Sequence, residues 1–256
     1  MSTPSLFLNE RAEALEGKDR AMLDAAVHLI NAVSPDTFAG DNLITFMKTC
    51  GFASDPTFLK AAGAVQQPDL VMRMAWRLHT VSWAARMALR IEGDFVECGV
   101  FMGFKSYFLM HYLDFGNVDR KFHLFDTFEG RPDKYSGATL NPSVHQRPGL
   151  HDFVVKRFAP WPNVIIHKGI VPDDVRIEAL PDKIAYLHLD MNAPEPERAA
   201  LELMYDRMSA GGVVVLDDYG WKPFEDQKLA ADAFFGARGQ PVMELPTGQG
   251  LVVKSG

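Results

Sequence analysis

The sequence predicts an α/β fold, in which a mostly parallel seven-stranded sheet ends in an antiparallel hairpin and is preceded by a layer of helices. After Gly93, short apolar runs that end in acids or glycines alternate with segments of helix length. Continuous rather than alternating hydrophobicity is typical of strands buried on both faces, as in a parallel sheet covered by helices. Before Gly93, apolar residues recur at steps of three and four, which indicates helices.

The first third of the chain is therefore predicted to be helical. Residues 1–90 are expected to form the helical layer, and residues 91–256 the domain that carries the sheet. Ser54 or Asp55 is suited to cap a helix, because a short polar side chain accepts hydrogen bonds from the unpaired amides of a first turn. A longer helix is expected over residues 69–91.

Seven segments are predicted to be strands. Five apolar runs form the parallel part, and the last two flank a Pro-Thr-Gly-Gln-Gly turn that is typical of a hairpin. The segments are Asp94–Gly99, Lys121–Asp126, Asn163–Lys168, Lys183–Asp190, Gly212–Asp218, Pro241–Leu245 and Leu251–Lys254.

Composition excludes several classes of protein. The 256 residues include 26 Lys and Arg against 33 Asp and Glu, a formal net charge of 26 − 33 = −7, so no nucleic-acid partner is expected. No apolar stretch approaches the ~20 residues that a bilayer span needs, and Met1–Arg20 lacks a secretion signal. The two cysteines, Cys50 and Cys98, fit a reducing compartment. A cytoplasmic protein without a membrane partner is expected.

The end of the first predicted strand has the features of a cofactor loop. Glu97 and Gly99 are followed by Gly103 at the start of a helix, where glycines allow a positive φ and the close approach of a ligand. Lys105 does not directly follow Gly103, so the spacing excludes a phosphate-binding P-loop. Asp126 ends the next strand and is suited to bind both hydroxyls of a ribose. The alternatives are a plain tight turn and, for Asp126, a helix or turn cap.

Three acids end the fourth and fifth predicted strands: Asp190, Asp217 and Asp218. Carboxylates gathered at one edge of a sheet raise one another's pKa unless a cation or proton compensates them. Three hard oxygen donors suit Mg²⁺ or a similar divalent cation, and the alternative is that some of them cap helices.

Four strings resemble the TylF/MycF-type (macrocin) O-methyltransferase family: FVECGV (Phe95–Val100), LFDTFEG (Leu124–Gly130), LHLDMN (Leu187–Asn192) and GGVVVLDDYGW (Gly211–Trp221). The resemblance implies a class I, Rossmann-like methyltransferase fold that binds S-adenosylmethionine. It implies that Asp190, Asp217 and Asp218 bind Mg²⁺ and that residues 169–174 form a wall for the adenine. The cofactor-binding residues it implies are Glu97, Gly99, Gly103, Ser106, Asp126, Thr127, Gly169 and Asp190.

The expected catalytic residues are His145 and Asp190. His145 lies in a loop rich in Pro, Gly and Asn, residues 131–149, that could close over the acceptor, and a histidine titrates in the range a general base needs. His151 and water remain alternatives for the base. His188, inside a strand, is expected to be a hydrogen-bonded core residue.

The predicted function is metal-dependent methylation of a hydroxyl group on a small molecule, such as a sugar or glycosylated metabolite. A nicotinamide-dependent oxidoreductase would need a GxGxxG turn and a Tyr-x-x-x-Lys pair, which the sequence lacks. A non-catalytic cofactor-binding protein would have no need of the acid cluster. A homo-oligomer is expected, because the early helices could pair two chains, although they could instead cover the acceptor.

Overall fold

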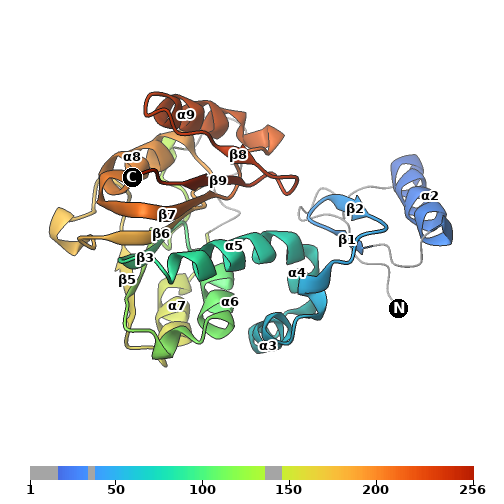
Figure 1. Cartoon of the computed structure of the whole chain (residues 1–256), viewed down its shortest axis with the longest axis horizontal. Helices are drawn as coiled ribbons and strands as arrows, with labels where there is room; N and C mark the ends of the chain where they lie inside the picture. The colour runs from blue at the N-terminus through green and yellow to red at the C-terminus, as the bar shows by residue number, and fades with distance from the viewer. Residues whose placement is uncertain (1–16, 34–37, 136–145) are drawn as a thin grey trace. The chain divides into compact units, whose positions relative to one another are not determined.

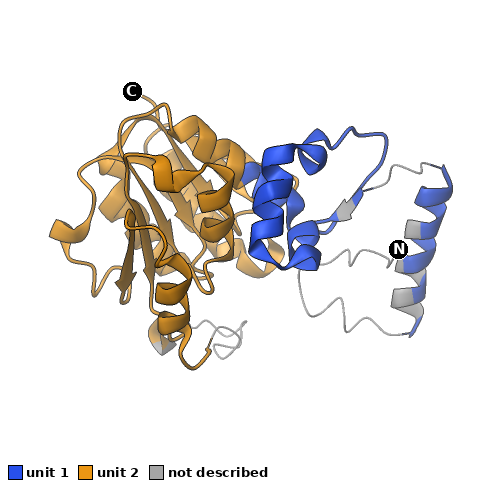
Figure 2. Ribbon diagram, turned by 90° about the horizontal axis from the view of Figure 1, so that it is seen from below, with its two compact units in different colours: residues 1–80 blue, residues 81–256 orange. Residues whose placement is uncertain are grey.

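The computed structural model describes residues 17–33, 38–135 and 146–256. The chain forms two compact units, Met1–Thr80 and Val81–Gly256, shown in blue and orange in Figure 2. The division falls within a helix, ten residues before the boundary expected from the sequence.

The first unit is mainly helical, as predicted, and also contains a small hairpin. Its strands, β1 (Phe38–Gly40) and β2 (Leu43–Thr45), pair antiparallel across Asp41 and Asn42, both with positive φ (53° and 55°). This is the backbone that a two-residue hairpin turn requires, and Asp and Asn tolerate it. Its described helices are α2 (Gly17–Val33), α3 (Pro56–Val65) and α4 (Pro68–Arg73), and α5 (Ala75–Ala88) begins in this unit and ends in the second.

Two aspartates cap helices in this unit. Asp55 accepts a hydrogen bond from the backbone N–H of Phe58 at 2.9 Å, which confirms it as the cap of α3. Asp41, in the hairpin turn, accepts from the backbone N–H of Trp76 at 2.7 Å and so caps the first turn of α5. The helix expected over residues 69–91 is two helices, because the backbone of Met74 (φ −111°, ψ 17°) departs from the helical conformation.

The second unit is built on a seven-stranded sheet with the order β5-β4-β3-β6-β7-β9-β8 (Figure 1). The first five strands are parallel, and β9 pairs antiparallel with both β7 and β8. The predicted sheet and hairpin are confirmed. The strands are β3 (Asp94–Cys98), β4 (Phe122–Asp126), β5 (Val164–Lys168), β6 (Ile184–Leu189), β7 (Met208–Leu216), β8 (Met243–Glu244) and β9 (Gly250–Val253).

Helices cover both faces of this sheet. Figure 1 shows α6 (Phe104–Tyr112) and α7 (Leu150–Phe158) on one side, and α8 (Pro194–Met204) and α9 (Glu225–Gly236) on the other. Every residue of β6 is buried, as expected of a central parallel strand between two helical layers. Among the described residues, no helix has both the length and the apolar character needed to cross a bilayer.

The order of the strands reverses between β3 and β6. The chain runs from β3 outward to β4 and β5, and returns to the other side of β3 as β6. In a doubly wound sheet, ligands bind beyond the carboxyl ends of the strands at such a switch point. Gly99 and Asp190, which follow β3 and β6, lie at this point.

Candidate functional site

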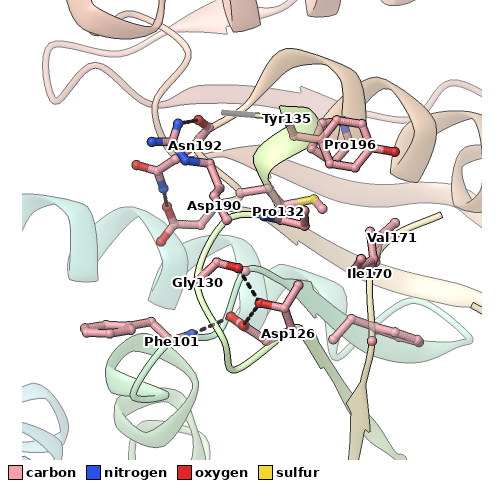
Figure 3. A pocket seen from close by; sticks show the side chains of 16 residues that line it. Phe101, Asp126, Gly130, Pro132, Tyr135, Ile170, Val171, Asp190, Asn192 and Pro196 are labelled. Atoms are coloured by element: carbon pink, nitrogen blue, oxygen red, sulfur yellow. Dashed lines mark hydrogen bonds between the residues drawn. The ribbon is translucent and has the colours of Figure 1, made fainter. Parts of the chain in front are cut away.

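A hollow opens at the carboxyl ends of β3, β4, β5 and β6 (Figure 3). Its empty space, including the open mouth, is about 830 Å³. Its lining is largely apolar with a few polar groups: Gly99, Phe101, Phe125, Asp126, Thr127, Gly130, Arg131, Pro132, Tyr135, Gly169, Ile170, Val171, Asp190, Met191, Asn192 and Pro196.

Gly99 allows the two central strands to end side by side. Its φ is +88°, and a Cβ added there would lie 1.9 Å from the carbonyl oxygen of Asp190. The backbone N–H of Asp190 donates to the carbonyl of Cys98 at 2.8 Å. A side chain at position 99 is therefore excluded both by the conformation and by the neighbouring backbone.

Asp126 lies in the hollow and holds two of its loops. Its Oδ2 accepts hydrogen bonds from the backbone N–H groups of Val100 and Phe101, both at 2.7 Å, and its Oδ1 accepts from that of Phe128 at 2.6 Å. Phe101 and Phe128 have positive φ, 49° and 55°, in a region unfavourable for a bulky residue. The cap predicted as the alternative for Asp126 is thus present, and its ribose contact stays a prediction.

Three more of the predicted cofactor residues line the hollow: Thr127, Gly169 and Asp190. The Thr127 hydroxyl donates to the carbonyl of Gly130 at 2.7 Å and closes the turn after β4. The predicted adenine wall, residues 169–174, contributes its first three residues to the lining.

The other predicted cofactor residues do not line this hollow. Glu97 is buried in β3, where its Oε1 lies 3.1 Å from His188 Nδ1. Gly103 has φ +70° at the start of α6, and a Cβ there would lie 2.6 Å from the Phe158 ring. The buried Ser106 hydroxyl donates back to the carbonyl of Gly103 at 3.4 Å. These contacts give all three a structural role, and their roles in cofactor binding stay predictions.

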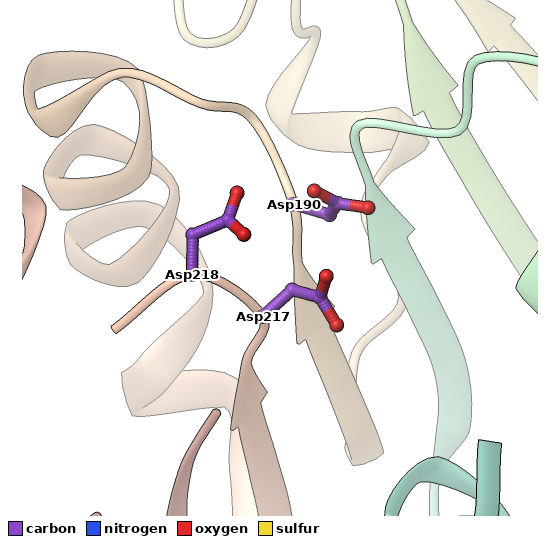
Figure 4. Close-up of side chains that lie close together, drawn as sticks. All are labelled: Asp190, Asp217 and Asp218. Atoms are coloured by element: carbon purple, nitrogen blue, oxygen red, sulfur yellow. The ribbon is translucent and has the colours of Figure 1, made fainter. Parts of the chain in front are cut away.

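The three acids at the strand ends lie together (Figure 4). Asp190 follows β6, and Asp217 and Asp218 follow β7, with one carboxylate oxygen of each within 4.8 Å of the others. Asp217 and Asp218 share the cluster because β7 ends at Leu216, so the alternation of side chains along a strand no longer applies to them. The sequence predicted that these three acids lie close together.

A lysine occupies the cation position in this cluster. Lys105, from the first turn of α6, places its Nζ 2.5 Å from Asp190 Oδ2 and 2.7 Å from Asp217 Oδ2, and its side chain is only 8% exposed. A divalent ion at these oxygens would have to displace the ammonium group, so the cluster as arranged does not fit Mg²⁺. The carboxylates are not left uncompensated, because Lys105 supplies a positive charge beside Asp190 and Asp217. Mg²⁺ stays a prediction from the sequence.

Charged groups continue from the cluster into the sheet. His188 lies between Glu97 and Asp217, with its Nε2 3.4 Å from Asp217 Oδ1, and Gln249 donates to the same oxygen at 2.9 Å. Burial alone would lower the pKa of His188, but its hydrogen bonds to Asp217 and Glu97 outweigh burial and raise that pKa to about 9. His188 is thus the hydrogen-bonded core residue that the sequence predicted.

Sequence interpretation missed the cationic and amide groups around Asp190. The Asn192 amide donates to Asp190 Oδ1 at 3.2 Å, and Arg131 donates to the carbonyl of Asn192 at 2.8 Å. Asn192 could have been found from its place in the sequence, since it follows Asp190, the acid that ends a predicted strand. For Lys105, the signal was a basic residue in the first turn of the helix after the glycine loop.

Two histidines, His145 and His151, were predicted as candidates for the general base. His145 lies outside the described residues. His151, the alternative, lies in the first turn of α7, where its ring is 5.2 Å from that of Phe128, and it lines a second hollow beside the first.

Comparisons with known proteins agree with this architecture. The profile of the macrocin-O-methyltransferase (TylF) family matches residues 62–239. A Streptomyces olivaceus protein, 8-demethyl-8-(2,3-dimethoxy-alpha-L-rhamnosyl)-tetracenomycin-C 4'-O-methyltransferase, is 32% identical over 143 residues, 50% of this chain and 54% of that protein. The chain thus matches about half the length of this curated relative.

Two solved structures share the fold. The O-methyltransferase NovP has a TM-score of 0.61 at 22% identity, covering 70% of this chain and 80% of NovP. The S-adenosylhomocysteine (SAH)-bound Podospora anserina methyltransferase PaMTH1 has a TM-score of 0.53 at 11% identity, covering 94% and 99%. At these identities the likeness shows the fold alone. Since the family profile spans 178 of the 256 residues, the chain belongs to the macrocin-O-methyltransferase (TylF) family.

Proposed function

We propose that this chain transfers a methyl group from S-adenosylmethionine to a hydroxyl group of a small glycosylated molecule. The observation that carries the proposal is the hollow at the switch point of the sheet, with Asp126 and Asp190 among its few polar groups. Family membership supports the reaction class, and the rhamnosyl compound in the name of the S. olivaceus relative supports a sugar-bearing acceptor.

The lining of the hollow fits S-adenosylmethionine. Phe125, Ile170 and Val171 offer apolar surface for an adenine ring. Asp126 already accepts three backbone hydrogen bonds, which leaves one acceptor position, on Oδ1, for a ribose hydroxyl. Gly99 leaves room beside the strand ends because no side chain projects there. The structurally similar PaMTH1 was solved with SAH, the product of the same methyl donor.

The residues near the acids would position the acceptor. When bound, S-adenosylmethionine supplies a methyl carbon that bonds to the acceptor oxygen as the carbon–sulfur pair returns to sulfur. Asp190 is held by Lys105 on one oxygen and by Asn192 on the other, so its carboxylate is fixed at the edge of the hollow. A fixed acceptor of hydrogen bonds orients a hydroxyl group for in-line attack, which accounts for much of the rate in such transfers.

The hydroxyl proton needs a base, for which we keep His145 as the proposal. His145→Ala is expected to lower kcat by about 10²-fold, the scale of general-base catalysis, with S-adenosylmethionine binding unchanged. His151→Ala is the matched control. A wild-type rate in His145→Ala together with a slow His151→Ala variant would move the role to His151. Magnesium is not part of this proposal, because Lys105 contacts two of the three carboxylates.

Calorimetry with S-adenosylmethionine, SAH and NAD tests the proposal without knowledge of the acceptor. The first two are expected to bind and NAD is not. Ile170→Trp, which fills the hollow, is expected to weaken binding tenfold or more, about 1.4 kcal/mol. Ile177→Trp is the control, since Ile177 is an exposed residue outside the hollow. Binding of NAD in place of S-adenosylmethionine would favour the oxidoreductase alternative.

The reaction is then tested with glycosylated small molecules by measuring SAH release and the mass of the product. A gain of one methyl group on the sugar is expected. Binding of S-adenosylmethionine without transfer to any hydroxylated acceptor would favour the non-catalytic alternative. The predicted homo-oligomer stays a prediction, which sedimentation of the purified chain would check.

A further inference from the structure

Lys105 is buried against the acid cluster. It stands in the first turn of α6, two residues after the glycine that begins the helix, and its side chain reaches the carboxyl ends of β6 and β7. Its Nζ donates to Asp190 Oδ2 at 2.5 Å and to Asp217 Oδ2 at 2.7 Å. Distances this short are those of charge-assisted hydrogen bonds between an ammonium and two carboxylates.

The ammonium and a divalent ion compete for the same place. A metal ion bound by Asp190 and Asp217 needs the two oxygens that Lys105 contacts, and an ammonium so close would be strongly repelled by it. Asp217 Oδ1 is engaged as well, by Gln249 at 2.9 Å. Moving Lys105 aside would separate a buried charge from its partners, which is strongly unfavourable.

We propose that Lys105 replaces the divalent cation in this chain, so that the enzyme works without a metal ion. This rests on the proposed methyl transfer. Lys105 neutralises the carboxylates and fixes Asp190, which lines the hollow where the acceptor would bind. It is a positioning residue that acts through Asp190, with a single charge fixed by the fold in place of an exchangeable dication.

Manganese binding tests this directly, because the paramagnetic resonance signal of free Mn²⁺ falls when the ion binds. For the wild-type protein we expect no saturable binding tighter than about 1 mM, the weak end of biological divalent sites. Lys105→Met keeps much of the stem and removes the charge, and it is expected to bind Mn²⁺ at least tenfold more tightly than wild type. Adding Asp217→Asn to Lys105→Met should abolish the gained binding.

Two results of the Mn²⁺ measurements would overturn the proposal. Saturable Mn²⁺ binding to the wild type that is tighter than about 1 mM and that Asp218→Asn removes would overturn the proposal and restore the metal site predicted from the sequence. Failure of Lys105→Met to gain binding, with its fold intact by circular dichroism, would also overturn it. If that variant does not fold, the wild-type measurement decides alone. S-Adenosylmethionine binding is measured on the same samples, so its absence would refute the proposed function separately.

With an acceptor in hand, turnover gives a second measurement. EDTA treatment is expected to leave the wild-type rate unchanged. Lys105→Met is expected to lower kcat more than tenfold with little change in KM for S-adenosylmethionine, and Lys105→Arg, which keeps the charge, is expected to recover part of the loss. Loss of turnover in EDTA, restored by Mg²⁺, would contradict a metal-free site.

Discussion

Replacing Asp126 by alanine tests how the hollow at the strand ends is held open. The carboxylate accepts hydrogen bonds from three backbone N–H groups, those of Val100, Phe101 and Phe128, at 2.6 to 2.7 Å. Both phenylalanines have positive φ, so their loops stay in an unfavourable conformation only while the carboxylate holds them. Asp126→Ala removes all three bonds and allows both loops to relax.

The size of the effect follows from the three bonds. A hydrogen bond to a charged group contributes about 1.5–3 kcal/mol, and water entering the open hollow would replace part of each. About 1 kcal/mol per bond gives a loss of about 3 kcal/mol, or a drop in Tm of about 6–12 °C for a chain of this length. Because the same loops line the hollow, S-adenosylmethionine binding should weaken tenfold or more, about 1.4 kcal/mol.

Differential scanning calorimetry and isothermal titration with S-adenosylmethionine measure both effects. Asp126→Asn keeps one carbonyl oxygen and should fall between Asp126→Ala and the wild type in Tm. Glu129→Gln, an exposed carboxylate in the same turn, is the control and should change stability by less than about 0.5 kcal/mol. An Asp126→Ala protein with the wild-type Tm and wild-type affinity would refute the reasoning.

Three further changes have defined outcomes. Gly99→Ala should prevent folding or lower Tm strongly, because the added Cβ would lie 1.9 Å from a backbone oxygen, whereas Gly236→Ala, with open space around it, should be neutral or stabilising by urea unfolding. Burial and the neighbouring His123 lower the pKa of His167 to about 4, so His167 stays neutral in the folded protein from pH 6.5 down to about 4. The unfolded chain takes up this proton below pH 6.5, hence stability should fall from pH 6.5 toward 4, by about 1 kcal/mol for the half-buried His167, and His167→Phe should flatten that fall. Arg120→Met should lower the free energy of unfolding by about 2 kcal/mol, measured by urea titration, because it leaves the carbonyls of Ala88, Leu89 and Gly93, at 3.1 to 3.2 Å, without their donor.

The sheet could be predicted because burial on both faces leaves continuous apolar runs in the sequence. Predicted and observed strands agree within one or two residues for β3, β4, β5 and β6. Strand β7 starts at Met208, four residues before the predicted start at Gly212. This start was missed because the pairing of β7 with β6 contains an irregularity after Ile184. The β1–β2 hairpin was missed because three-residue strands are too short for a periodic pattern.

The sequence predicts those parts of the site whose position depends on the strand topology alone. Parallel strands bring the residues after their carboxyl ends together, and this placed Asp190, Asp217 and Asp218 correctly. Lys105 was not placed, since its position depends on how the first turn of α6 is rotated toward the strand ends. The contact of Glu97 with His188 was not predicted, since it depends on the direction of the side chain within β3.

The C-terminal hairpin also contributes to the acid cluster, through Gln249. Its amide, just before β9, donates to Asp217, so the β8–β9 turn holds one member of the acid cluster. Side chains alternate along a strand, and a slip of one residue in the pairing of β9 with β7 would turn this amide to the opposite face. Loop insertions or fusions engineered into the β8–β9 turn would thus alter the orientation of a carboxylate in the acid cluster, although they are made at the periphery of the domain.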